Sequence, residues 1–271
     1  MKVLAGIVAF KPDFARLREN LDAIRSQVDA VGIWDNGGLS GFSPEQDVII
    51  LSDKGENVGI AAALNGLCAY AEQNGFDWVL TLDQDSIAPT GLISAYSKYC
   101  HDETIGLLCP CIHDRNYGAM EYDKGSDQET DTVDTCITSA SMLRISAWKK
   151  IGGFWDELFI DMVDFDLCWS LQEHGFRIVR VNSQILCHEI GHSRKVRFLG
   201  KENVVYNHSP FRCYYIARNT IAVGRKHNRI SQCRRWILKR ILLINLFESE
   251  RLKKDRMIIK GIRDGIRLGR Q

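Results

Sequence analysis

One stretch of this chain decides its fold: Asp77-Trp78-Val79-Leu80-Thr81-Leu82-Asp83-Gln84-Asp85-Ser86. Its first part is a run of apolar and β-branched residues, which is typical of a strand buried on both faces. The run ends in two aspartates that are separated by one residue. In open α/β sheets, ligands bind outside the carboxyl ends of the strands, so the end of this strand is a candidate binding site.

Strands and helices alternate over the first hundred residues. Continuous apolar runs occupy residues 3–10, 31–36 and 47–52, whereas apolar residues have helical spacing over residues 12–24 and 59–73. A parallel sheet covered by helices on both faces requires this alternation. We therefore predict an α/β fold with a doubly wound, mostly parallel sheet and flanking helices, because a chain of 271 residues is too short for an eight-fold barrel.

The pattern changes after residue 104, where shorter strands surround a polar loop. We expect strands at residues 105–112, 132–145 and 177–188, and helices at residues 146–154 and 164–174. The first of these helices is expected to begin at Ser146 and to end at Gly152-Gly153. Beyond residue 209 the sequence is helical, with segments near 209–227, 231–247 and 252–268. We predict a main domain over residues 1–224 and a basic helical C-terminal extension over residues 225–271.

The composition is that of a soluble globular protein, with 45% hydrophobic and 25% charged residues. It excludes a disordered chain, a collagen-like chain and a coiled coil, and no apolar run approaches the ~18–20 residues of a membrane-spanning helix. The apolar N-terminus suits a buried first strand better than a signal peptide. The nine cysteines favour reduced thiols in a cytosolic protein, because several of them lie in apolar segments.

The net charge of +1 conceals an uneven distribution. From Arg225 to Gln271 there are 15 Lys/Arg and four Asp/Glu, a net charge of +11, so the rest of the chain carries −10. This asymmetry indicates a tail with an anionic partner, the alternative being a solvated helical face. The helix at 231–247 also mixes basic and apolar residues, which suits a helix lying in the headgroup plane of a membrane. Its apolar face could instead pack on the core or on a partner subunit.

Four groups of residues are candidates for chemistry. Asp83 and Asp85 are hard oxygen donors at a strand end, which suit Mg²⁺ or Mn²⁺ bridging to phosphate. Asp161, Asp164 and Asp166 precede an apolar helical face and exceed what helix capping requires, so one of them is a candidate general base. The other two groups are His188, at the end of an apolar run, and the loop of residues 56–61, whose small residues allow a nucleotide to approach the backbone.

In this order, these pieces resemble the family 2 inverting glycosyltransferases of the GT-A fold, within the bacterial rhamnosyltransferase-like group. The resemblance covers roughly residues 2–225. It departs from the family pattern at Val163, where many relatives have Glu, and at Ser170, where many have Arg. The matching segments are residues 9–10, 34–37, 57–65, 78–86, 159–169, His188 with Gly191, and 214–219.

The resemblance implies a role for each matching residue. For the nucleotide-sugar donor, it implies contacts from Ala9, Phe10, Asp35, Asn57, Asp83, Gln84 and Arg218. For a Mg²⁺ or Mn²⁺ ion, it implies the ligands Asp83, Asp85 and His188. For the acceptor hydroxyl, it implies that Asp164 is the catalytic base, with no covalent nucleophile.

The resemblance also implies transfer of L-rhamnose from dTDP-rhamnose to a lipid-linked saccharide in surface polysaccharide synthesis of the O-antigen or capsule type. Such an enzyme is expected in the cytoplasm, peripheral on the inner face of the cell membrane. A galactofuranosyl or other hexosyl donor stays open, and an oligomer is compatible with the sequence. A sugar-nucleotide nucleotidyltransferase would need a glycine-rich basic loop near the first strand, which residues 6–13 lack. No nucleic-acid motif accompanies the basic tail, so we expect no nucleic-acid partner.

Overall fold

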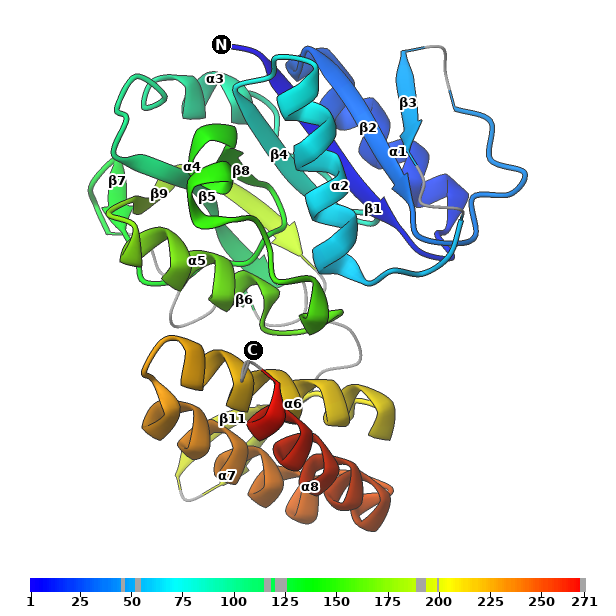
Figure 1. Cartoon of the computed structure of the whole chain (residues 1–271), viewed down its shortest axis with the longest axis vertical. Helices are drawn as coiled ribbons and strands as arrows, with labels where there is room; N and C mark the ends of the chain where they lie inside the picture. Colours follow the sequence, from blue (N-terminus) through cyan, green and yellow to red (C-terminus); the bar gives the residue numbers. More distant parts are fainter. Residues whose placement is uncertain are drawn as a thin grey trace. The chain divides into compact units, whose positions relative to one another are not determined.

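A computed structural model gives the structure of the chain, with residues 1–44, 47–51, 55–114, 118–119, 126–188, 194–198 and 200–268 described (Figure 1). The chain divides into two compact units. The first comprises Met1–Phe159 and Val163–Glu189, and the second comprises Ile160–Met162 and Ile190–Gln271.

The first unit is built on a nine-stranded sheet whose N-terminal half is parallel. Strand β1 (Val3–Ala9) lies between β2 (Ala30–Asp35) and β4 (Trp78–Asp83), and β3 (Val48–Leu51) pairs with the far side of β2. All three pairings are parallel, and they follow the chain order that a doubly wound fold requires. The predicted parallel sheet is confirmed.

The other half of the sheet is mixed. Its strands are β5 (Ile105–Asp114), β6 (Gly118–Ala119), β7 (Thr130–Thr132), β8 (Ser141–Arg144) and β9 (Arg177–His188). The strand predicted over residues 132–145 is wrong in its middle, because residues 133–140 form a loop between β7 and β8. The hydroxyl of Thr81 donates to the carbonyls of Thr138 and Ser141, and Ala140 has a φ of 56°, which no strand allows.

Two layers of helices enclose the sheet (Figure 1). One layer contains α1 (Phe14–Ile24), the 3₁₀ helix η1 (Arg25–Gln27) and α3 (Leu92–Ser97). The other contains α2 (Ile60–Gln73), α4 (Ile145–Ile151), the 3₁₀ helix η3 (Asp156–Leu158) and α5 (Val163–Glu173). Helix α4 begins at Ile145, one residue before the predicted Ser146. It ends at Ile151 and is capped by Gly152, the predicted stop, with a φ of 83°.

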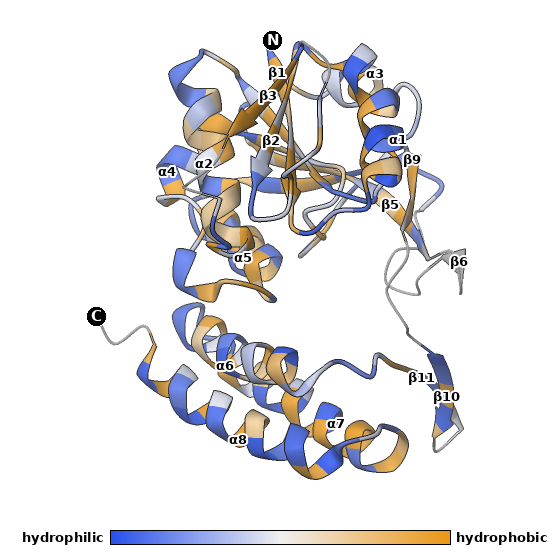
Figure 2. Cartoon of the chain, turned by 90° about the vertical axis from the view of Figure 1, so that its right-hand side faces the viewer, coloured by the Kyte–Doolittle hydropathy of each residue, from blue (hydrophilic) through white to orange (hydrophobic). Residues whose placement is uncertain are grey.

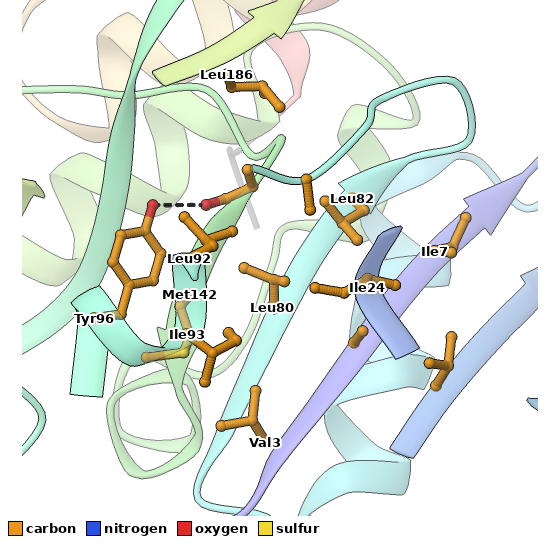
Figure 3. Packing of buried hydrophobic residues seen from close by; sticks show 14 of the residues in the cluster. Val3, Ile7, Ile24, Leu80, Leu82, Leu92, Ile93, Tyr96, Met142 and Leu186 are labelled. Atoms are coloured by element: carbon orange, nitrogen blue, oxygen red, sulfur yellow. Dashed lines mark hydrogen bonds between the residues drawn. The ribbon is translucent and has the colours of Figure 1, made fainter. Parts of the chain in front are cut away.

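Alternate residues of β1 point to opposite layers. Val3, Ala5, Ile7 and Ala9 are buried in the core that α1 and α3 cover, together with Leu80, Leu92 and Tyr96. Figure 3 shows this packing, in which the hydroxyl of Tyr96 donates to the carbonyl of Ala140 at 3.0 Å. Figure 2 shows that hydrophobic residues follow the strands of this sheet.

The opposite face of the sheet carries glycines so that α2 can lie close to it. A Cβ at Gly6 would lie 3.1 Å from Leu67 of α2, which is tighter than ordinary packing. The ring of Trp34 fills the space over Gly66, where a Cβ would lie 1.9 Å from Cζ3 of the ring. Trp34 therefore sets the position of α2, whose N-terminus begins near the carboxyl edge of the sheet.

The second unit combines a hairpin with three helices: β10 (Arg194–Phe198), β11 (Lys201–Val205), α6 (Pro210–Lys226), α7 (Ile230–Phe247) and α8 (Arg251–Arg267). All three helices agree with the prediction. The backbones of α6 and α8 approach closely, because Cβ atoms at Gly261 and Gly265 would lie 2.4 Å and 2.2 Å from carbonyls of α6. Helix α6 thus packs with α7 and α8. The compact units divide near residue 190. The division predicted at residue 225 instead falls at the end of α6. A functional division at 225 stays a prediction.

A buried ion pair lies where α7 ends and α8 begins. Lys254 is 1% exposed, and its Nζ lies 2.7 Å from Glu248 and donates to Oδ1 of Asn207 at 2.8 Å. Because an unpaired charge is costly to bury, these three residues hold the connection between the two helices in one arrangement.

All nine cysteines are free thiols in this structure. None of the helices in the described part of the chain combines the length and the hydropathy of a membrane span.

Candidate active site

The pairing register brings three predicted site residues to one edge of the sheet. Ala9 at the end of β1 pairs with Asp35 at the end of β2, and the preceding residue of β1 pairs with Asp83 at the end of β4. Asp35 and Asp83 are half-buried, whereas Asp85 in the following turn is exposed. The carboxyl edge of a parallel sheet is the usual ligand site of this architecture, so these residues surround a candidate site.

Hydrogen bonds tie the loops at this edge to one another. The Phe10 amide donates to Oε1 of Gln84 at 2.8 Å, which joins the ends of β1 and β4. The Lys11 amide donates to the carbonyl of Gly37 at 2.7 Å, which joins the ends of β1 and β2. The ring of Phe10 remains 42% exposed beside this edge, so it is available to a planar ligand.

Asn20 is a residue of the site that the sequence analysis missed. It is completely buried on α1, and its Nδ2 donates to the carbonyl of Asp83 at 2.8 Å. This bond holds the backbone at the start of the Asp83–Asp85 turn. A signal was present, because Asn20 is a polar residue on the helix face that Leu17, Leu21 and Ile24 bury.

The end of β4 and the turn after it carry two carboxylates, those of Asp83 and Asp85, whose oxygen atoms are candidate metal ligands. The Ser86 amide donates to the carbonyl of Asp83 at 3.1 Å, which closes a turn after β4. The hydroxyl of Ser139 then donates to that of Ser86 at 2.8 Å. Among the residues that the structure describes, no three His, Cys, Asp or Glu side chains gather into a metal-binding group. The side chain of His188 and the segment Gly191-His192-Ser193 lie outside the described part.

The loop before α2 is connected to the loop before α5. Oδ1 of Asn57 accepts from the Gly59 amide at 3.0 Å, and the Asn57 side chain is exposed. Gly59 has φ 86° and ψ 167°, a combination open in practice only to glycine. A Cβ there would lie 2.7 Å from the carbonyl oxygen of Phe159, and that carbonyl accepts from the Ile60 amide at 2.6 Å.

The segment that precedes Asp164 has a strained backbone. Phe159, Asp161 and Met162 all have positive φ angles, between 63° and 65°, although none is a glycine. Such clusters persist only where surrounding contacts hold them, and they occur preferentially at functional sites. The contacts here come from Asn219, whose Nδ2 donates to the carbonyls of Ile160 at 2.6 Å and Asp161 at 3.0 Å.

The three acidic residues of this region have different environments. Asp161 forms an ion pair with Arg212 at 3.0 Å. Asp166 is 1% exposed, so it cannot meet a substrate without rearrangement. Asp164, in the first turn of α5, is half-buried, and its Oδ1 accepts from the Phe165 amide at 2.9 Å. Of the three, Asp164 is therefore the best placed to receive a proton.

Arg218 belongs to the second unit. Its Nε donates to Oδ1 of Asn219 at 2.8 Å, and its guanidinium lies over the ring of Tyr215 at 4.6 Å. The same Asn219 thus contacts both Arg218 and the backbone before Asp164.

A cysteine nucleophile is disfavoured next to the acidic motif. Cys168 of α5 is fully buried, and a hydrogen bond with Cys136 together with burial raises its pKa well above the ordinary value. The thiol therefore stays protonated near neutral pH, where only a thiolate would be reactive.

No protein-family model matches the chain. Individual known proteins are nevertheless similar to it in sequence or in structure. The dTDP-rhamnosyl transferase RfbF of Shigella flexneri is 26% identical over 242 residues, which span 83% of this chain and 81% of that protein. A structure of S. aureus TarS (residues 1–349) superposes with a TM-score of 0.63, at 13% identity, over 98% of this chain and 80% of that one. The chain has the GT-A fold of glycosyltransferases. The predicted resemblance and fold class are confirmed.

Two further solved structures share the fold of this chain. TarS in complex with UDP-GlcNAc superposes with a TM-score of 0.59 at 14% identity, over 98% of this chain and 81% of that one. GalNAc-T7, solved with UDP, GalNAc and Mn²⁺, superposes with a TM-score of 0.56 at 11% identity, over 90% of this chain and 57% of that one.

The contact between Gly59 and Phe159 yields a stability prediction. We expect Gly59→Ala to destabilise the protein by about 3 kcal/mol or more, because it adds a collision with Phe159 to a backbone conformation reserved for glycine. Gly55→Ala is the matched control, since Gly55 also has a positive φ of 70° but its Cβ would meet nothing within 4 Å. The control is expected to cost only about 1–2 kcal/mol. Equal losses in urea unfolding would contradict the contact.

Proposed function

We propose that this protein is a family 2 glycosyltransferase that transfers L-rhamnose from dTDP-rhamnose, with inversion, onto a lipid-linked saccharide during synthesis of an O-antigen or capsule-type polysaccharide. The similarity to the dTDP-rhamnosyl transferase RfbF supports the donor, because it extends over most of both chains. The observation on which the proposal depends is the alignment of Ala9, Asp35 and Asp83 at one sheet edge.

The nucleotide part of the donor would bind where β1 and β2 end. Asp35 would accept a hydrogen bond from the base, while its Oδ1 already accepts from the Gly37 amide at 2.9 Å and is thereby oriented. Phe10 would cover the base with its exposed ring, and Ala9 and Asn57 would line the ribose. Gln84 would act mainly by holding Phe10 in place through their hydrogen bond.

A Mg²⁺ or Mn²⁺ ion fits the donor set at the end of β4. These cations take one or two carboxylates and complete their shell with substrate phosphates and water. Asp83 and Asp85 would supply the carboxylates, with His188 as a further ligand. Because substrate phosphates and water complete the shell, the three side chains need not be gathered before the donor binds. When bound, the ion would neutralise charge on the departing diphosphate. Arg218 is the side chain proposed to assist it.

Asp164 would act as the general base in a single displacement. The acceptor oxygen attacks the anomeric carbon, the bond from that carbon to the diphosphate breaks, and the acceptor proton passes to Asp164. Attack from the face opposite the leaving group inverts the anomeric centre. Asn219 and Arg212 would hold the strained segment before Asp164, so that the carboxylate is already oriented.

The proposed place of action is the cytoplasm, peripheral on the inner face of the cell membrane. There a lipid-linked acceptor and a water-soluble nucleotide-sugar are both accessible. In this proposal, residues 1–224 bind the donor and perform the reaction, and the basic region 225–271 contributes to membrane or partner contact. A nucleic acid is not among the proposed partners, and an oligomer is compatible with the proposal.

A donor screen tests the function. Hydrolysis of the donor, which releases nucleoside diphosphate, is measured for dTDP-rhamnose, UDP-galactofuranose and UDP-GlcNAc, each with and without Mn²⁺. We expect dTDP-rhamnose to be hydrolysed fastest, in a Mn²⁺-dependent way. Preference for the galactofuranosyl donor would replace the donor assignment, and turnover of none of the three would contradict the proposed function.

The base assignment has its own prediction. Asp164→Asn is nearly isosteric, so donor binding should survive while turnover falls by about 10²–10⁴-fold, the usual range for loss of a positioned base. Asp161→Asn is the comparison, and because it weakens the ion pair with Arg212 it should have a smaller effect. If Asp161→Asn abolishes turnover and Asp164→Asn does not, the assignment of Asp164 as the base is wrong.

The metal assignment predicts a folded but inactive variant. Asp85 is exposed, so Asp85→Ala should leave the melting temperature nearly unchanged while it abolishes Mn²⁺-dependent turnover. Replacement of the exposed Asp127, which the proposal places outside the site, should leave turnover and its Mn²⁺ dependence intact. Full activity of wild-type protein in EDTA would refute the metal site.

A further inference from the structure

The apolar side chains of α7 and α8 divide into a buried set and an exposed set. Cys233, Ile237, Ile244 and Ile258 are buried within the second unit, mostly against α6. A second set is exposed, and its members are Leu238 (66%), Leu242 (46%) and Leu246 (43%) on α7, and Leu252 (76%), Ile259 (58%) and Ile266 (40%) on α8. The buried set accounts for the packing of both helices, so the exposed set needs another explanation.

The exposed residues form one stripe on each helix. Those on α7 are four residues apart and those on α8 are seven residues apart, and both spacings keep side chains on a single helical face. Figure 2 shows hydrophobic and hydrophilic residues mixed along both helices.

An apolar groove lies among α6, α7 and α8. It has a volume of about 290 Å³, and its walls are the isoleucines of the three helices together with Leu238. Arg225 and Arg234 are the charged residues among its lining. Leu238 and Ile266 belong both to the groove and to the exposed stripes, so groove and stripes form one continuous apolar surface.

Exposed basic residues lie on the same two helices, α7 and α8, as the apolar stripes. They are Arg234, Arg235 and Lys239 on α7, and Arg251, Lys253, Arg256, Lys260, Arg263 and Arg267 on α8. The four acidic side chains of the same helices and their connection all have partners in the second unit: Glu248 with Lys254, Glu250 with Lys253, Asp255 with Asn245, and Asp264 with Tyr214. The outward charge of the surface is therefore positive.

We infer that this surface docks on the face of an anionic phospholipid bilayer, with α7 and α8 in the headgroup plane. Acyl chains would cover the leucine and isoleucine stripes and enter the groove, while phosphates would contact the flanking Lys and Arg residues. A second copy of the chain would bring like charges face to face. A nucleic acid would pair with the charges but would leave the exposed aliphatic side chains uncovered. The inference does not depend on which sugar is transferred.

Deleting the tail cannot test this surface, because α7 and α8 also contribute buried residues to the second unit. Point variants of exposed residues are suitable. The full-length protein is sedimented with vesicles of phosphatidylcholine alone and with vesicles that also contain phosphatidylglycerol. We expect binding only to the anionic vesicles, and weaker binding when salt is raised from about 0.1 M to about 1 M, where the Debye length falls from ~10 to ~3 Å.

Two variants separate the charged and apolar contributions. Arg256→Gln with Arg263→Gln should weaken vesicle binding by about 30-fold, since each basic residue near an anionic surface contributes about five-fold. Leu238→Ser with Ile259→Ser should weaken it by at least about ten-fold. The matched controls lie in the first unit: Lys2→Gln with Lys98→Gln for charge, and Ile50→Ser for exposed apolar area, the latter residue being 42% exposed.

Circular dichroism verifies that each variant is folded. Loss of binding in the α7–α8 variants but not in the controls supports the docking surface. Failure of wild-type protein to bind anionic vesicles, or equal binding by wild-type and both α7–α8 variants, would overturn it. If light scattering shows that the wild-type protein is a dimer and that the Leu238→Ser, Ile259→Ser variant is a monomer, the surface binds a second copy of the chain and the inference is overturned.

Discussion

The parallel pairing of β1 with both β2 and β4 is the interaction on which the rest of this structure depends. Because parallel neighbours end at the same edge, this pairing places Ala9, Asp35 and Asp83 together although they are far apart in the sequence. A slip of one residue would turn the side chains of a strand to its opposite face. The register is held by burial on both faces, with α1 and α3 on one side and α2 on the other.

Loops at this edge are restrained from both sides. Buried Asn20 holds the backbone of Asp83, and the side chain of Gln84 holds Phe10. On the other side, Gly59 and Phe159 pack so closely that the loops before α2 and α5 cannot move independently. A site built from strand ends and restrained turns is oriented before any ligand arrives, which reduces the entropic cost of binding.

The sequence predicted those features that depend on local periodicity. The parallel strands, the late helices and the acidic strand end are all visible as patterns within about ten residues. The loop at residues 133–140 was missed because its conformation depends on hydrogen bonds from Thr81, which is distant in sequence. The place of α6 in the second unit was missed for the same reason, since it depends on Gly261 and Gly265. The restraint of Asp161 by Asn219 likewise has no local signature.

The most direct test of the central claim is hydrogen–deuterium exchange of the full-length protein with and without dTDP-rhamnose and Mn²⁺. If the sheet edge binds the donor, exchange should slow in three separate segments, residues 8–11, 35–38 and 83–86, at the same donor concentration. Slowing in only one of these segments would mean that the strand ends do not form one site. Unchanged exchange in all three, with protection elsewhere, would contradict the account.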